Sequence, residues 1–176
     1  MKAIHIALFL ALGISQASGQ VAAPRIHFTN YDKSLGSSGI NADGDIVFSG
    51  VVTVSGKLRL EREDPDLCGG VCAYFVPDAT SQKRLPRNIG TNGPMNISIV
   101  NLYDASPILN KLVGRKSVLK ILSKPSPVFE YPVTVVLKDY RIYGACNAIH
   151  HQAKVLNITR QGEYVALSTS GSHGGC

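Results

Sequence analysis

The 176-residue chain contains no tryptophan, and after residue 19 it has no apolar run long enough to cross a membrane as a helix. Its lysines and arginines are scattered among acidic residues and form no dense basic stripe, which argues against nucleic acid as a partner. A Gly-x-Ser-x-Gly motif, the mark of many serine hydrolases, is also absent. We therefore expect no transmembrane segment in the mature chain and no catalytic set of a familiar type.

The first 19 residues have the pattern of a secretory signal peptide. Lys2 supplies a positive charge, Ile4 to Ile14 form a largely apolar run, and Ala17-Ser18-Gly19 offer the small residues that a signal peptidase needs. No cysteine directly follows the apolar run, which disfavours a lipid anchor. We expect an exported protein, periplasmic or secreted, that loses residues 1–19.

The chain has four cysteines, an even number that indicates two disulfides in an oxidising compartment. Two arrangements stay open. In the first, Cys68 pairs with Cys72 across Gly69-Gly70-Val71, and Cys146 pairs with Cys176. In the second, the loop that holds Cys68 and Cys72 is tied to the C-terminal region.

A metal site near the C-terminus is the sharpest alternative use of these cysteines. Cys146 and His150 are four residues apart. His173 and Cys176 are three residues apart. Each pair could fix two ligands of zinc or copper with one local turn. An exported chain favours a disulfide between the two cysteines instead, which also disfavours a catalytic thiol at Cys146 working with His150 and His151.

The clearest periodicity runs from Ile46 to Glu61, where apolar residues occupy every second position. This pattern predicts a long strand with one buried face. Gly50 or Gly56 would mark a bend or bulge in it. The predicted buried residues are Phe48, Val52, Val54, Leu58 and Leu60.

Further strands and one short helix are expected along the rest of the chain. The helix starts at Ser106-Pro107 and ends before Gly114, because serine caps helices and proline fits their first position. Residues 20–45 are expected to be a flexible lead-in that ends in a turn. The expected strands are 71–76, 96–103, 115–123 and 133–143, with weaker candidates at 155–159 and 163–168.

The order of these elements is typical of the OB-fold, a five-stranded, partly open barrel. Two segments resemble small bacterial exported OB-fold-like domains of an uncharacterised family: Val54-Ser55-Gly56-Lys57-Leu58 and Leu112-Val113-Gly114-Arg115-Lys116-Ser117-Val118. The resemblance covers residues 46–143. It implies a barrel and a binding role, and it carries over no catalytic residue. The predicted fold class is therefore all-β with one short helix: an OB-like five-stranded barrel, followed by a β/loop extension at 144–176 that disulfides tie down.

In OB-folds two loops flank the ligand face, and we place the second of them at residues 124–132. This loop contains Phe129 and Tyr131, whose rings could stack on a sugar. The other interpretation is that both rings pack against the end of the barrel. The candidate ligand-binding residues are Arg59, Phe129 and Tyr131.

These features predict an exported, non-enzymatic binding or interaction module with no cofactor. The sequence pI near 9.2 suggests an acidic partner, an anionic glycan or an envelope protein, but a modest positive excess that aids solubility is the better explanation of this pI. A metal-binding envelope protein and a small secreted enzyme are the alternatives. Sequons for N-glycosylation begin at Asn96 and Asn157, and the sequence does not say whether they are used.

Overall fold

The structure is a computed structural model that describes residues 28, 30–36, 38–62, 70–87, 95–102, 107–114, 116, 128–145 and 148–167. Several predictions fall outside these residues. They are the signal peptide at 1–19, nearly all of the strand at 115–123, and the residues Cys68, Cys146, His173 and Cys176.

The described chain is mostly β-sheet, which confirms the all-β prediction. Its strands are β1 (Ser38–Ile40), β2 (Ile46–Arg62), β3 (Val71–Pro77), β4 (Ile97–Ile99), β5 (Val128–Ala145), β6 (Ala148–Arg160) and β7 (Val165–Leu167). The predicted short helix is α3 (Pro107–Val113), between β4 and β5. Two single turns were not predicted: η1 (Lys33–Leu35) and α2 (Ala79–Gln82), the latter capped by the Asp78 carboxylate, which accepts a hydrogen bond from the Ser81 backbone.

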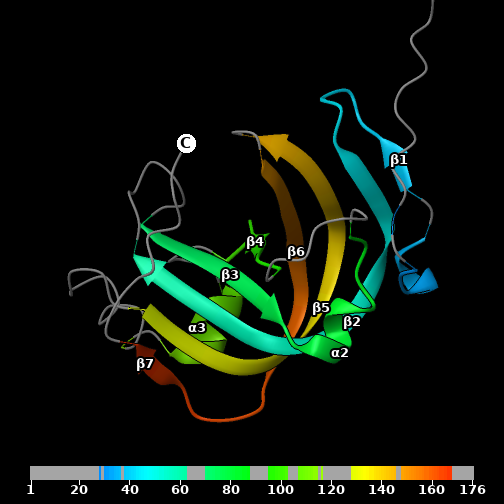
Figure 1. The fold of residues 1–176 in the computed structure, drawn as a ribbon. Helices are drawn as coiled ribbons and strands as arrows, with labels where there is room; N and C mark the ends of the chain where they lie inside the picture. The colour runs from blue at the N-terminus through cyan, green and yellow to red at the C-terminus, as the bar shows by residue number, and fades with distance from the viewer. Residues whose placement is uncertain are drawn as a thin grey trace, which may run out of the picture.

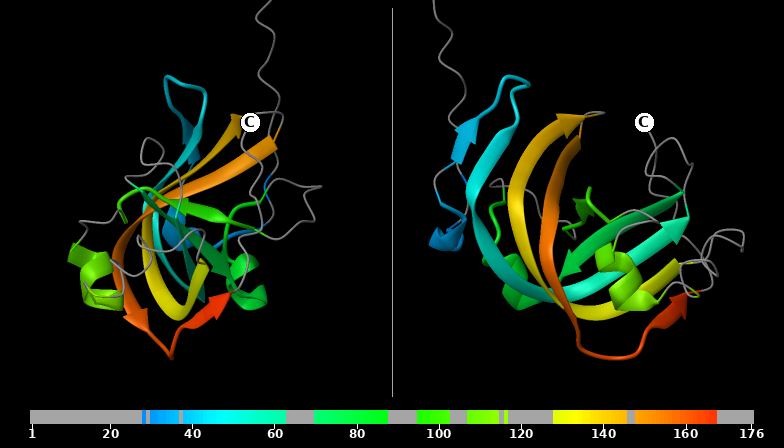
Figure 2. Two further views of the ribbon diagram at one scale, coloured as in Figure 1. Left: turned by 90° about the vertical axis from the view of Figure 1, so that its left-hand side faces the viewer. Right: turned by 180° about the vertical axis from the view of Figure 1, so that it is seen from behind.

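The strands form one sheet in the order β1-β2-β3-β4-β6-β5-β7, and β2 also pairs with β5. The pairings therefore link five strands, β2, β3, β4, β6 and β5, into a ring. Strands β4 and β6 run parallel, whereas the other pairs in the ring are antiparallel. The long strands β2 and β5 curve strongly along their length, as the three ribbon views show (Figure 1, Figure 2).

A glycine bulge shapes β2, as predicted. The register between β2 and β5 shifts between Phe48 and Val51, on either side of Gly50. A Cβ atom at Gly50 would lie 2.0 Å from the carbonyl oxygen of Ser34, which precedes Leu35 in η1. Only glycine therefore allows η1 to pack this closely against the strand.

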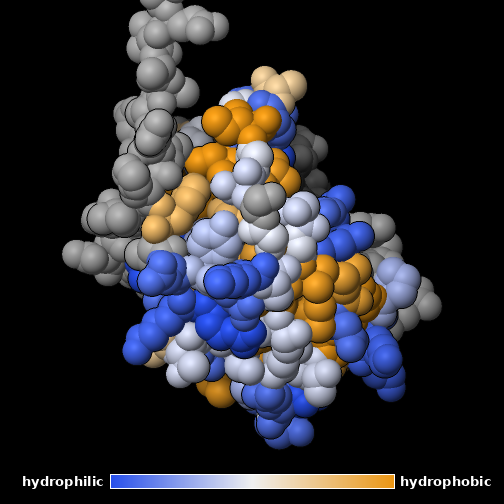
Figure 3. Space-filling view, turned by 90° about the vertical axis from the view of Figure 1, so that its right-hand side faces the viewer, coloured by the Kyte–Doolittle hydropathy of each residue, from blue (hydrophilic) through white to orange (hydrophobic). Residues whose placement is uncertain are grey.

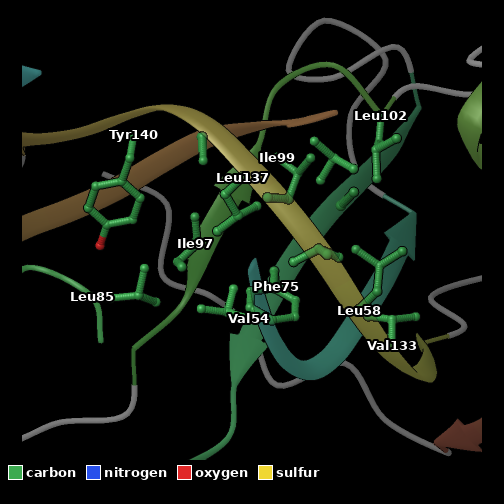
Figure 4. Packing of buried hydrophobic residues seen from close by; sticks show 14 of the residues in the cluster. Val54, Leu58, Phe75, Leu85, Ile97, Ile99, Leu102, Val133, Leu137 and Tyr140 are labelled. Carbon is green, nitrogen blue, oxygen red and sulfur yellow. The ribbon is translucent and has the colours of Figure 1, made fainter. Parts of the chain in front are cut away.

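The hydrophobic core lies inside the ring. All five residues predicted to form the buried face of β2 are at most 2 % exposed. Figure 4 shows side chains of β2, β3, β4 and β5 meeting there, with Val54, Phe75 and Leu137 among them. Each such side chain stabilises the fold by roughly 1.5–3 kcal/mol relative to an exposed position.

Part of the segment expected to be a flexible lead-in packs against β2. Leu35 is fully buried, and β1 pairs with the start of β2. The Asp32 carboxylate accepts hydrogen bonds from the backbone N–H of Ser34 and from the Arg84 guanidinium, and these lower the pKa of Asp32 to about 2. The contact between Asp32 and Arg84 fastens this segment to the chain that follows α2.

Strand β5 begins earlier than predicted, so the loop placed at 124–132 is wrong from Val128 onward. Pro132 misled the prediction, because proline has no N–H to give to a sheet. Here β7 pairs with β5 only up to Glu130, and β6 pairs with it only from Val133. Among the described strands, Pro132 thus pairs with β2 alone, while its carbonyl oxygen accepts from the Gln161 backbone, and a sheet tolerates proline where no ladder needs its N–H.

The last two strands of the ring also differ from the prediction. They are β5 and β6, whereas the sequence placed them at 115–123 and 133–143. Strand β5 continues past residue 143, where the C-terminal extension was expected to begin, and β6 pairs with both β4 and β5. The predicted third strand, 96–103, shrinks to β4, and the weak candidates at 155–159 and 163–168 fall within β6 and around β7.

Candidate functional site

The two aromatic candidates, Phe129 and Tyr131, are buried in β5. They are 4 % and 1 % exposed, and the ring centroid of each lies 5.6 Å from that of Tyr164. The Arg160 guanidinium lies over the Tyr131 ring at 5.7 Å. The rings therefore pack within the protein and leave little surface on which a ligand could stack.

Arg59, the third candidate, takes part in an ion cluster on the outer face of β2 and β5. Its Nη2 lies 2.7 Å from Oε1 of Glu130, and Lys57 Nζ lies 3.0 Å from Oε2 of the same carboxylate. Burial raises the pKa of Glu130, but hydrogen bonds from Arg59 and Lys57 outweigh it and hold the pKa below its usual range. This geometry gives Arg59 a structural partner, since a buried carboxylate that lost its cations would destabilise the fold.

The two adjacent histidines point to opposite faces of β6. His150 stacks on Tyr143, with ring centroids 5.3 Å apart, and its Nε2 lies 3.1 Å from the carbonyl oxygen of Ala145. His151 turns toward the core, where its Nδ1 lies 2.8 Å from the Tyr140 hydroxyl. Burial, together with the nearby charges, lowers the pKa of His151 to about 4.

The metal hypothesis stays a prediction, because Cys146, His173 and Cys176 lie outside the described residues. Within the residues that are described, no three histidine, cysteine or acidic side chains gather into a group that could hold an ion. Cys72 is buried in β3 and is not a free thiol. Its partner, like the disulfide arrangement as a whole, stays a prediction.

Sequence reasoning missed a hollow of about 310 Å³ on the outer face of the sheet. Its walls come from the turn before β2, from β2 itself, from the residue after β4, and from β5 and β6. We call it the Arg141 hollow. It is lined by Asn41, Val47, Val100, Asp139, Arg141, Gln152 and Lys154.

Strand register places Arg141 in the middle of this hollow. Arg141 is opposite Val47 on one side and Gln152 on the other. Its Nε donates to the side-chain oxygen of Gln152, and its Nη1 lies 3.2 Å from Oδ2 of Asp45. Asn41 holds Asp45 in turn, because its Oδ1 accepts the Asp45 backbone N–H at 2.8 Å. The guanidinium plane is therefore fixed from two sides, while the side chain stays 39 % exposed.

A bulge brings an acid and a base to the rim of the Arg141 hollow. The register between β5 and β6 shifts between Lys138 and Arg141, and within the shift Asp139 has a φ of 49°. Asp139 Oδ2 lies 3.1 Å from Lys154 Nζ, and both side chains are about half exposed. The bulge thus aims the Asp139 carboxylate away from the ladder and toward solvent.

A pair of aromatic rings lies next to the Arg141 hollow. Tyr143 and His150 are opposite each other in the register of β5 and β6, and their ring planes differ by only 23°. The Arg141 guanidinium lies 5.5 Å from the centre of the Tyr143 ring.

Figure 3 shows, on the side of the molecule that faces right in Figure 1, that apolar and hydrophilic side chains occupy separate areas.

A signal for this site was present in the sequence. Arg141 and Tyr143 alternate with buried residues of β5, and Gln152 and Lys154 alternate with buried residues of β6. The sequence left residues 144–154 unassigned, so the β5–β6 hairpin that brings these side chains together was not recognised.

Comparisons with known protein families, curated proteins and solved structures found no match. Among the described helices, none has the length and apolar character needed to cross a membrane. Function is therefore inferred from the geometry of the outer face alone.

Proposed function

We propose that the chain is a non-enzymatic glycan-binding module whose ligand lies in the Arg141 hollow. One observation carries the proposal: a fixed guanidinium, two side-chain amides and a carboxylate surround a single hollow. Planar groups of this kind pair with the hydroxyl groups of a sugar, because they donate and accept hydrogen bonds in fixed directions. The hollow is at the small end of ligand pockets, so it fits one or two sugar units.

The ring pair formed by Tyr143 and His150 supports the same ligand class. The carbon-bound hydrogens of a sugar give it an apolar face, which packs on aromatic rings while its hydroxyl groups stay hydrogen-bonded. Both rings are partly exposed beside the Arg141 hollow. A glycan chain that leaves the hollow along the β5–β6 hairpin would meet them.

The proposal includes an OB-like barrel as the scaffold. It is supported by the ring order β2-β3-β4-β6-β5, by the parallel pair β4 and β6, and by the position of α3 between β4 and β5. An OB-fold has five strands in a partly open barrel and binds oligosaccharides in many proteins. The proposal also keeps export and two disulfides, which are supported by the signal-peptide pattern of residues 1–19 and by the even number of cysteines.

The test compares two arginines with matched surroundings on a printed array of neutral and acidic glycans. Arg141 and Arg160 each lie over a tyrosine ring and pair with a carboxylate, but only Arg141 lines the hollow. We expect the wild-type protein to bind a defined set of glycans. Arg141→Ala should lose about tenfold or more in affinity, the usual effect of removing a charged hydrogen-bond donor. Arg160→Ala should bind as the wild type does.

Two results would overturn the proposal: no glycan retained by the wild type, or equal binding by the wild type and Arg141→Ala. Thermal unfolding of each variant shows whether a loss of binding merely reflects a loss of fold.

A further inference from the structure

We propose that Asp139 makes the Arg141 hollow selective for neutral glycans with adjacent hydroxyl groups, against acidic glycans. The inference rests on the proposed function and names the ligand class of that same site. It also departs from the expectation of an anionic ligand, which came from the charge of the whole chain.

The backbone at Asp139 is the first support. Asp139 has a φ of 49°, in the left-handed region that favours glycine. Among the described residues, every other residue with a positive φ is a glycine, namely Gly36, Gly44, Gly70 and Gly114. A carboxylate therefore occupies a position that glycine would fill with less strain, and strain of this kind gathers at functional sites.

The charges around the hollow are the second support. Each cation that lines it faces an acid, with Arg141 against Asp45 and Lys154 against Asp139. The positive charge of the whole chain is thus offset locally. An acidic sugar that entered would bring its carboxylate close to Asp139, and like charges repel.

The pair of Asp139 and Lys154 offers the chemistry that two neighbouring hydroxyl groups need. The carboxylate accepts a hydrogen bond from one hydroxyl group, and the ammonium donates one to the next. Both side chains are half exposed, at 53 % and 48 %, so a ligand can reach them. With the charge of Asp139 removed, the two lining cations, Arg141 and Lys154, would face Asp45 alone, and the site would come to favour acids.

The experiment measures the ratio of neutral to acidic glycan binding on the same array. We expect Asp139→Asn to lower this ratio about tenfold, the order of one lost charged hydrogen bond. Asparagine tolerates a positive φ, so this variant keeps the bulge. The matched control is Glu163→Gln, which also removes one ion-paired carboxylate but lies outside the hollow. It should leave the ratio unchanged.

A second variant separates fold from binding. Asp139→Gly should melt at the same temperature as the wild type or higher, because glycine removes the strain, yet it should bind neutral glycans less well. An unchanged ratio in Asp139→Asn, or an equal shift in Glu163→Gln, would overturn the inference while leaving glycan binding in place. A wild type that binds no glycan would overturn both proposals.

Discussion

His151 shows how much one buried side chain controls in this protein. Its ring lies on the inner face of β6 beside the Tyr140 hydroxyl, and burial raises the pKa of Tyr140 so that the hydroxyl stays protonated. The Tyr140 hydroxyl can donate a hydrogen bond to Nδ1 of a neutral His151 ring, and burial disfavours the charged ring. The fold therefore favours an uncharged His151.

The lowered pKa of His151 predicts that the free energy of unfolding depends on pH. The pKa of His151 falls from 6.5 in a free side chain to about 4 in the fold, so the unfolded chain binds the extra proton first. The stabilisation is complete above pH 6.5 and is lost as the pH falls toward 4. We expect wild type to lose about 2 kcal/mol more than His151→Gln between pH 7.5 and 4.5. Urea unfolding at both pH values measures this, with His150→Gln as the control that should follow the wild type.

Single residues were also where sequence reasoning was least complete. The pattern of β2 revealed which side chains are buried, but it could not show that Phe129 and Tyr131 are covered by Tyr164. Asp139 gave no signal, because a bulge depends on the register of two strands. Arg141 and Gln152 lie far apart from Asn41 in sequence, so only the folded ring brings them to one hollow.

At the scale of elements, η1 and β2 depend on Gly50. Its missing side chain lets the backbone of Ser34 and Leu35 approach β2 at the bulge. The neighbouring contact between Arg84 and the carbonyl oxygen of Thr53, at 2.7 Å, fastens the segment after α2 to the same strand.

Gly50→Ala should therefore destabilise the protein by about 2–3 kcal/mol, the cost of forcing a methyl group into a packed position. The comparison is Gly144→Ala in β5, where an added Cβ atom would meet nothing within 4 Å. That variant should stay within about 0.5 kcal/mol of the wild type, as surface substitutions generally do. Equal stability of the two variants in urea unfolding would show that η1 does not pack against Gly50 as described.

Whole strands and helices were predicted well where a single sequence pattern, such as alternation or a capping residue, identified them. The strands β2 and β3 and the helix α3 follow from alternation and capping residues. The first half of β6 was missed because its outer residues, from His150 to Lys154, are polar and its inner face includes His151. Pro132 obscured the start of β5. Whether a sheet tolerates proline depends on the strands beside it, and the sequence does not show which strands these are.

At the scale of the whole molecule, export and disulfide bonding stay predictions that one mass measurement addresses. We expect intact mass after expression with export to show loss of residues 1–19 and, on reduction, the gain of the hydrogens of two disulfides. An unprocessed N-terminus would contradict export. Free Cys146 and Cys176 together with a retained metal would favour the metal-binding alternative.

Both proposals depend on glycan binding in the Arg141 hollow. An NMR titration of the isotope-labelled protein with the glycan that the array selects tests this binding residue by residue. We predict that the perturbed backbone amides cluster at Asn41 to Val47, at Asp139 to Tyr143 and at His150 to Lys154. Perturbations centred on Arg59, Phe129 and Tyr131, with the Arg141 hollow unaffected, would contradict binding in the hollow.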